Sequence, residues 1–274
     1  MIPSAHRDSG LGYRKVDGIA WLTLDRPDRG NALSPALRHA LTWAWDDVRD
    51  DPAVRVAVVT GAGDKHFCTG ADLSHRVAQD RRGEPVSPDD RPFEEVNSFT
   101  ARHRGVWKPV ICAVNGLAAS AGLHFVVDAD LVIAAETAAF CDTHVDVGQV
   151  GAIENIGLAK RLPLGTALRM TLMGRAYRLS AERAYQLGLV DELTTPGALL
   201  ATAEEMARQL MAVSPRAQSL SQQAIWRSLD MGYAQATELG WAYVRMQWAH
   251  PDATEGPRAF AERRPPRWYD GGQP

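Results

Sequence analysis

Short apolar runs alternate with helix signals along the first two thirds of the chain, and this alternation constrains the fold more than any other feature. The runs contain many β-branched residues, as strands buried on both faces of a sheet do. They occupy residues 19–24, 54–60, 110–114 and 131–134. Helices are expected from Ser34-Pro35 and from about Ala118. Since strands that alternate with helices pair in parallel, the sequence predicts an α/β core.

The character of the sequence changes near residue 200. Beyond Pro196 strand signals vanish and helix starts appear, the first of them at Ser214-Pro215. We therefore expect a core at residues 1–200 and a helical lobe at residues 201–274. At 274 residues the chain reaches the size at which a single core stops growing. The lobe is therefore expected to complete its burial against other subunits.

Composition narrows the compartment and the partners. Lys and Arg number 30 against 33 for Asp and Glu, so a net charge of -3 gives no general attraction to nucleic acid or to an anionic membrane. The sequence has neither a signal-peptide pattern nor a run of about 18 apolar residues. Three cysteines, Cys68, Cys112 and Cys141, cannot all pair, which indicates a reducing, cytoplasmic location.

One stretch of the core differs in kind from the rest. Residues 76–92 are almost all charged or turn-forming, which predicts a surface loop. Such a loop is either a lid beside a pocket or a plain insertion.

Two turns rich in small residues are candidates for oxygen binding. Residues 67–73 (Phe-Cys-Thr-Gly-Ala-Asp-Leu) follow a predicted strand, and residues 115–122 (Asn-Gly-Leu-Ala-Ala-Ser-Ala-Gly) join a strand to a helix. A helix N-terminus offers unpaired N–H groups, and small residues let a ligand oxygen approach them. Together the turns suggest two N–H donors that converge on one oxygen and stabilise an enolate or a tetrahedral oxyanion.

These turns also carry a family resemblance. With residues 24–33, residues 128–131 and residues 255–264 they occur in the order typical of the enoyl-CoA hydratase/isomerase, or crotonase, superfamily, which the chain resembles over nearly its whole length. The resemblance implies a spiral of ββα repeats with a C-terminal helical trimerisation lobe, assembled as a homotrimer or a dimer of trimers. It implies an acyl-CoA thioester as substrate, with coenzyme A as part of that substrate and no separate cofactor.

The resemblance also assigns binding residues. The oxyanion hole falls on the backbone N–H groups of Ala71 and Ala121, and the family normally has glycine at the second position, so the extra methyl is expected to narrow the site or shift the turn. The implied coenzyme A contacts are Arg26, Arg29, Ala71, Asp72, Leu73, Phe260 and Arg263. The last two reach over from the tail of the same or a neighbouring subunit.

The catalytic positions depart from the family. Its hydratases use two glutamates, and the matching positions here are His124 and His144. His124 lies in an apolar helix, where a buried structural histidine is an equal alternative. If the segment around His144 is extended, Asp142 and Asp146 share its face and raise the imidazole pKa or fix its tautomer. A histidine with an ordinary pKa of about 6.5 suits proton transfer at neutral pH.

A third acid is expected just beyond His144. In isomerase and dehalogenase branches of the family a carboxylate begins the next helix. A direct count puts Ala152 there, but the segment is slightly longer than usual, which moves Glu154 or Asn155 to that position. The alternative is that Glu154 is simply an acid in a first helical turn.

Two other chemistries fit the sequence less well. Asp142, His144 and His124 could form a two-histidine, one-carboxylate metal set, but no short ligand spacing supports it and we expect no metal. Ser120 lacks the Gly-x-Ser-x-Gly setting of a nucleophile, so we expect its hydroxyl to cap the following helix.

Three functions remain as hypotheses. The first is an acyl-CoA hydratase or isomerase, in which the oxyanion hole holds an enolate and His144, helped by His124 or Glu154, moves a proton or orients water. The second is a C–C bond or thioester hydrolase of retro-Claisen type, in which His144 activates water. The third is a non-catalytic acyl-CoA-binding protein. We favour catalysis because both glutamates are replaced by residues that titrate.

Overall fold

Six strands form the large sheet, four of them at the apolar runs of the sequence, whereas the first and the last of the six were not predicted. The computed structural model describes residues 6, 8–74, 77, 81 and 92–269. The strand order is β1-β2-β3-β5-β7-β10. The bounds are β1 Leu11–Val16, β2 Ile19–Leu24, β3 Val56–Gly61, β5 Val110–Val114, β7 Leu131–Ala135 and β10 Glu192–Thr194. Every pair beyond the β1–β2 hairpin is parallel, which confirms the predicted α/β core.

A second, smaller sheet was not predicted. Its order is β4-β6-β8-β9, with bounds β4 His66–Cys68, β6 Leu117–Ala119, β8 Ala139–Cys141 and β9 Leu179–Ser180. The expectation of a helix from about Ala118 is therefore wrong by a few residues. Residues 117–119 pair in parallel with both β4 and β8, and the helix begins only beyond this strand.

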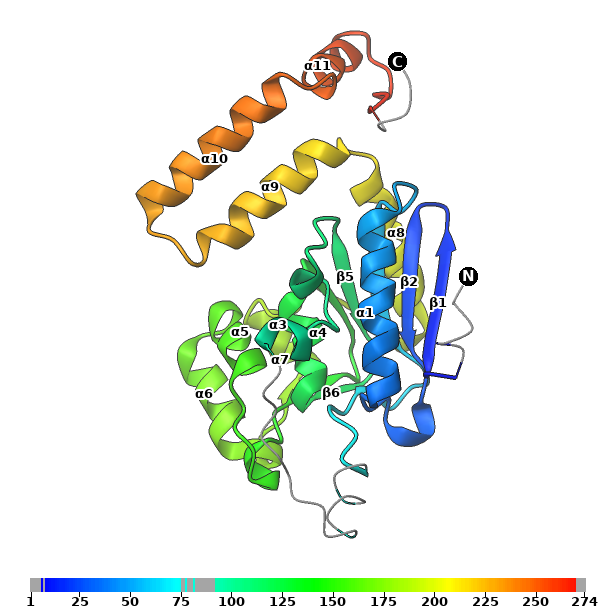
Figure 1. The fold of residues 1–274 in the computed structure, drawn as a ribbon, viewed down its shortest axis with the longest axis vertical. Helices are drawn as coiled ribbons and strands as arrows, with labels where there is room; N and C mark the ends of the chain where they lie inside the picture. The colour runs from blue at the N-terminus through cyan, green and yellow to red at the C-terminus, as the bar shows by residue number, and fades with distance from the viewer. Residues whose placement is uncertain (1–5, 7, 75–76, 78–80, 82–91, 270–274) are drawn as a thin grey trace.

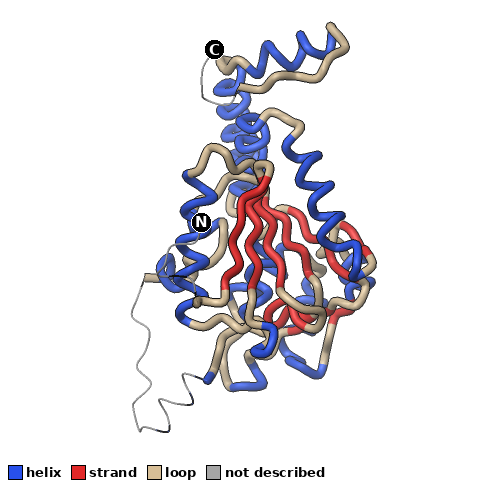
Figure 2. The backbone as a smooth tube through the Cα atoms, turned by 90° about the vertical axis from the view of Figure 1, so that its right-hand side faces the viewer, coloured by secondary structure: helices blue, strands red, loops and turns tan. Residues whose placement is uncertain are grey.

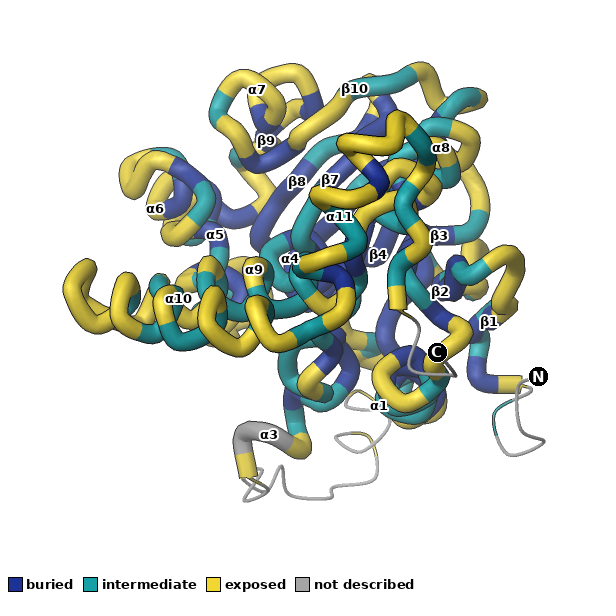
Figure 3. Tube along the Cα trace, turned by 90° about the horizontal axis from the view of Figure 1, so that it is seen from above, coloured by how far each residue is buried: buried dark blue, intermediate teal, exposed yellow. Residues whose placement is uncertain are grey.

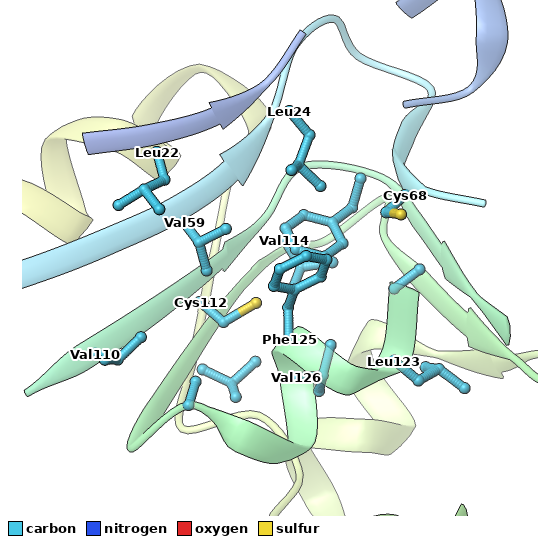
Figure 4. Close-up of a cluster of buried hydrophobic side chains, with 14 of the residues drawn as sticks. Leu22, Leu24, Val59, Cys68, Val110, Cys112, Val114, Leu123, Phe125 and Val126 are labelled. Atoms are coloured by element: carbon cyan, nitrogen blue, oxygen red, sulfur yellow. The ribbon is translucent and has the colours of Figure 1, made fainter. Parts of the chain in front are cut away.

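Helices cover both faces of the large sheet, as Figure 2 shows. Helix α1 (Pro35–Asp50) starts as expected, because the Ser34 side chain accepts a hydrogen bond from the backbone N–H of Leu37. Its apolar face packs on the main hydrophobic cluster, which Figure 4 shows around Val59, Cys112 and Phe125. Helix α8 (Leu199–Met211) covers the opposite face with a second cluster.

The remaining helices connect and surround the sheets. The α-helices are α3 Phe93–Val96, α4 Leu123–Asp128, α5 Ile153–Arg161, α6 Leu164–Met173, α7 Ala181–Gln186, α9 Pro215–Ser228, α10 Tyr233–Trp248 and α11 Asp252–Ala261. The 3₁₀ turns are η2 Pro27–Arg29, η3 Arg102–Arg104, η4 Ser120–Gly122, η5 Val145–Val147, η6 Gly174–Ala176 and η7 Pro196–Ala198. Among the described residues no helix is long and apolar enough to cross a bilayer.

The last three helices extend away from the sheets (Figure 1). Because α8 packs on the large sheet, the part of the tail that leaves the core begins at α9. Helices α9 and α10 pack on each other but contain no buried residue, and Figure 3 draws them in yellow and teal. Ile225, Trp241 and Trp248 are all more than half exposed. Apolar helices of this kind need a partner surface.

We therefore expect the protein in solution to have the mass of a trimer or of a dimer of trimers. The double substitution Ile225→Glu and Trp248→Glu should shift it to smaller species, because it places charge on the face that the tail leaves exposed. Light scattering coupled to size exclusion measures both masses.

Tyr185→Glu is the control, because Tyr185 is equally exposed but lies on α7, outside the tail. A monomeric wild-type protein, or an equal effect of the tail and α7 substitutions, contradicts the prediction.

Candidate active site

The two predicted turns meet at one point. Gly70 has φ +97°, and a Cβ on it would lie 2.7 Å from Ser120 Cβ and 3.1 Å from the backbone nitrogen of Ala121. A side chain at residue 70 would therefore push the turns apart, so glycine is required by both the backbone angle and the close approach. The contact brings the first turn, which continues from β4, against η4, which ends the second turn.

Both proposed donors lie at this contact. The bridge between Leu33 and Ala71 uses the carbonyl of Gly70 and the N–H of Asp72, so the N–H of Ala71 points away from Leu33. Ala121 stands in the first turn of η4, where backbone N–H groups lack helical partners. Its methyl belongs to the main hydrophobic cluster, so the departure from glycine adds to the core.

Ser120 does not cap the helix, contrary to the sequence-based expectation. Neither η4 nor α4 has a side-chain cap. The Ser120 hydroxyl instead lies 3.2 Å from His144 Nε2 and 3.4 Å from His144 Nδ1. The backbone of Ser120 has φ +50°, in the left-handed region that residues with a Cβ rarely adopt.

A buried aspartate fixes His144. The imidazole Nδ1 donates to Asp142 Oδ1 over 2.6 Å, and the backbone N–H of His144 donates to the same oxygen. The segment does not extend as expected, because His144 leads into the 3₁₀ turn η5. Asp146 therefore faces Arg175, whose Nε lies 3.0 Å from its carboxylate, and of the two aspartates Asp142 is the one that contacts His144.

The neighbours of Asp142 hold its carboxylate in place. Its other oxygen accepts a hydrogen bond of 2.7 Å from Asn155 Nδ2, on α5. Asp142 has no exposed surface. Gly151 completes the enclosure, because a Cβ there would overlap both Asn155 Nδ2 and Asp142 Oδ2.

Glu154 lies between His124 and His144. Its Oε1 is 3.0 Å from His144 Nδ1 and its Oε2 is 3.2 Å from His124 Nε2. The single proton of His144 Nδ1 is used by Asp142, which leaves Oε1 buried without a hydrogen-bond donor. The structure thus brings together all three residues predicted to be catalytic, and it adds Asp142 to them.

The charges of the cluster support one another. The hydrogen bond that His144 donates to Asp142, and then its contact with Glu154, raise the pKa of His144 to about 10. Burial raises the pKa of Glu154, but the imidazoles of His124 and His144 outweigh it and hold the pKa below its usual range. The pKa of Asp142 is also lowered, since bonds from His144 and Asn155 overcome the effect of burial.

The same groups have a spacing that also suits a metal ion. Ligand atoms of Asp142, His144 and Glu154 lie within 4.8 Å of one another. The Nδ1 of His144, however, is engaged by its hydrogen bond to Asp142, and the Nε2 faces Ser120. We therefore interpret the cluster as hydrogen-bonded proton-transfer groups, and the absence of a metal stays a prediction.

The predicted coenzyme A contacts fall into two places. Near the first turn, Arg26 Nη2 binds Asp72 Oδ2 over 2.8 Å, and hydrogen bonds from Ser74 and then Arg26 lower the pKa of Asp72 to about 2. Arg29 and Leu73 are exposed beside them. Phe260 lies in the last turn of α11 and is 87% exposed, and Arg263 lies just beyond the end of that helix. Helix α11 lies at the far end of the molecule from β6 (Figure 1).

Within one chain the tail residues therefore do not meet the turns. The expected loop at residues 76–92 lies almost wholly outside the described residues.

Sequence reasoning missed several members of the site. It named Asn155 only as an alternative to Glu154, whereas the structure gives both a place, and it did not single out Gly151. The close spacing of Asp142 and His144 was a usable signal for their pairing. Nothing in the sequence indicates the left-handed backbone of Ser120, because that conformation depends on how its turn packs against Gly70.

Comparisons with known proteins agree on one family. The family profile described as enoyl-CoA hydratase/isomerase matches residues 14–271. The (E)-benzylidenesuccinyl-CoA hydratase of Thauera aromatica is 34% identical over 90% of this chain and 94% of its own length. The carnitinyl-CoA dehydratase of Salmonella arizonae is 35% identical over 91% and 94%.

Solved structures extend the likeness to the fold. An enoyl-CoA hydratase/isomerase from Mycobacterium paratuberculosis is 37% identical and has a TM-score of 0.85, over 95% of this chain and 98% of that one. An enoyl-CoA hydratase from Mycobacterium tuberculosis is 33% identical with a TM-score of 0.83, over 96% and 100%.

The pairing with Asp142 predicts how His144 titrates. In Asp142→Asn the pKa of His144 should fall well below 10, and it should stay above the ordinary value of about 6.5 because Glu154 remains beside the ring. Nitrogen-detected NMR of the imidazole measures the change. Asp146→Asn is the matched control, because Asp146 faces Arg175, and it should leave the titration nearly unchanged.

Stability should follow the same linkage. The pKa of His144 is higher in the folded chain than in the unfolded one, so the stabilisation is complete below pH about 6.5 and is lost as the pH rises through about 10. The loss of unfolding free energy in Asp142→Asn, measured by urea titration, should accordingly shrink across that window. If the substitution lowers the free energy of unfolding by the same amount at every pH, the ion pair between Asp142 and His144 does not stabilise the fold.

Proposed function

Because the chain belongs to the enoyl-CoA hydratase/isomerase family, we propose that it adds water to, or removes water from, an acyl-CoA thioester across the Cα–Cβ bond. One observation carries the proposal. Two imidazoles and two carboxylates, from His124, His144, Asp142 and Glu154, stand beside the contact of the two turns. Relatives named as a hydratase and a dehydratase support this direction of chemistry.

The two turns hold the thioester oxygen. The N–H groups of Ala71 and Ala121 donate to it, and these hydrogen bonds strengthen as the oxygen gains charge in the enolate. Backbone donors suit this role because they are fixed before the reaction and need no reorganisation. The close approach at Gly70 keeps the two donors at one oxygen.

His144 acts as the acid in the direction of hydration. Its side chain is 19% exposed, which makes it more accessible than Asp142 or Glu154. Both carboxylates favour its imidazolium form, so at neutral pH it carries a proton that it can give to the α carbon of the enolate. In the direction of dehydration the neutral imidazole takes that proton back.

The pair of His124 and Glu154 takes the proton that the attacking water releases. Their Nε2 and Oε2 atoms lie 3.2 Å apart, within hydrogen-bond reach, so a proton can pass between the two side chains. The imidazole of His124 packs against Phe99, and the centres of the two rings lie 5.2 Å apart. This division supplies the acid and the base that the family's two glutamates provide.

Coenzyme A completes the substrate and is bound from two sides. Arg26, Arg29 and Leu73 contact it near the first turn. Phe260 and Arg263 reach it from the tail of a neighbouring subunit, because in their own chain they lie far from the turns. Homotrimers or dimers of trimers supply that neighbour, and the reaction needs no cofactor.

Substitution of His144 tests the proposal. Hydration of crotonyl-CoA and of (E)-benzylidenesuccinyl-CoA, and dehydration of carnitinyl-CoA, are followed through the absorbance of the enoyl thioester. We expect His144→Gln to lower the rate on the accepted substrate by about 10²- to 10⁴-fold, since a general acid is lost.

His39→Gln, at an exposed histidine on α1, is the matched control and should keep the wild-type rate. A His144→Gln rate within a few-fold of wild type rejects the assignment. A crotonyl-CoA rate typical of the glutamate hydratases would show that the histidines have no consequence.

A further inference from the structure

The hydroxyl of Ser120 is the one group of the site that hydration does not use. We propose that Ser120 is a nucleophile, activated by His144 and Asp142, which takes the acyl group from an acyl-CoA thioester and gives the protein a hydrolase activity through an acyl-enzyme. This inference rests on the proposed function for acyl-CoA binding and for the oxyanion hole. It adds a covalent step that the proposed function lacks.

The backbone at Ser120 is built to present a side chain. Strand β6 ends at Ala119, Ser120 takes φ +50°, and the helical turns η4 and α4 follow at once. A sharp strand-to-helix turn in a left-handed conformation lifts the central side chain out of the sheet, as in the nucleophile elbow of serine hydrolases. Strain at a residue with a Cβ is kept where the surrounding structure enforces it, commonly at functional sites.

The three side chains form a connected relay. Ser120 Oγ lies 3.2 Å from His144 Nε2 and 3.4 Å from Nδ1, so the hydroxyl is within reach of the ring but must shift to come in line with Nε2. His144 Nδ1 in turn donates to Asp142 over 2.6 Å. Because the proton on Nδ1 is held by Asp142, Nε2 is the nitrogen that can accept the serine proton. Asn155 binds the second oxygen of Asp142 and fixes its orientation. Contacts of this length between a nucleophile and its base shorten in the complex with substrate.

The oxyanion hole stands in the correct place for attack by this serine. Ala121 immediately follows Ser120, and the residue after a serine nucleophile commonly supplies one of the N–H donors. The second donor, Ala71, follows Gly70, over which Ser120 Cβ is packed. One carbonyl oxygen between the two N–H groups therefore places its carbon beside Ser120 Oγ.

The reaction balances with water as the only co-reactant. In the first half, the Oγ–C bond forms, the C–S bond breaks, and the serine proton passes through His144 to the coenzyme A sulfur, which leaves as the free thiol. In the second half, water gives a proton to His144 and attacks the ester. The acid leaves and the proton returns to Ser120.

Protonation of His144 separates this reaction from hydration. The titratable groups that face the ring are Asp142 on its own loop and Glu154 on α5, with His124 of α4 beyond Glu154. Both carboxylates favour the imidazolium, which cannot accept the serine proton. Hydrolysis should therefore rise with pH as His144 loses its proton, whereas hydration, which uses the imidazolium, should fall over the same range.

Butyryl-CoA is the test substrate, because a saturated acyl chain cannot be hydrated. We expect the wild-type protein to release coenzyme A from it, detected with a thiol reagent, and the rate to rise with pH. Ser120→Ala and Ser120→Gly should each lower the release by about 10³-fold or more. The glycine variant tolerates the positive φ, so it keeps the fold even where alanine does not.

Ser228→Ala, at a serine whose hydroxyl donates to the carbonyl of Ile225 on its own helix α9, is the control and should release coenzyme A at the wild-type rate. Mass spectrometry supplies a second readout. A fluorophosphonate should attach to the peptide that contains Ser120 in the wild-type protein, and should fail to attach in the Ser120→Gly protein.

Two results overturn the inference and leave the proposed hydration intact. One is the absence of both coenzyme A release and fluorophosphonate labelling in a protein that hydrates an enoyl-CoA. The other is release that persists in Ser120→Gly, which would assign the attack to a water molecule activated by His144.

Discussion

The site depends first on the hydrogen bond between the buried Asp142 and His144. A carboxylate without exposed surface would be costly unless its oxygens were bonded, and here His144 and Asn155 supply those bonds. The bond sets the imidazole so that Nε2 faces Ser120 and the ring edge faces Glu154. Because a charged partner is buried beside it, the imidazole is held charged as well as oriented. Each chemical role that we assign follows from that orientation.

The second constraint is the close approach of the two turns. It arises from the small sheet, in which β4 and β6 pair side by side and so bring the two turns together. Gly70 allows the contact, at which Ser120 has a left-handed backbone conformation. One contact between the turns thus places both the backbone N–H groups of Ala71 and Ala121 and the hydroxyl of Ser120. The large sheet and α1 pack behind this contact and support it.

The sequence predicts the large sheet well and the small sheet not at all. Long apolar runs and the Ser34 cap are local signals, and the structure has strands and a helix where they indicate. The strands of the small sheet span only two or three residues, which is too short for periodicity to show.

Within the site, the resemblance to the family's catalytic positions predicted His124 and His144. The count of residues beyond His144 predicted Glu154. The partner of Asp146 and the conformation of Ser120 depend on contacts with distant residues, so pattern alone could not supply them.

With two histidines in the site, its negative charge resides on the neighbouring carboxylates of Asp142 and Glu154. A pair of imidazoles in a half-buried site would repel each other if both were protonated and would lack a strong base if both were neutral. Glu154, set between them, and Asp142, bonded to one of them, remove both problems. Glu154 holds that position from the first turn of α5. Since an imidazole serves as an acid when charged and as a base when neutral, this arrangement lets one residue support proton donation to an enolate and activation of a hydroxyl, with the proton on His144 deciding between them.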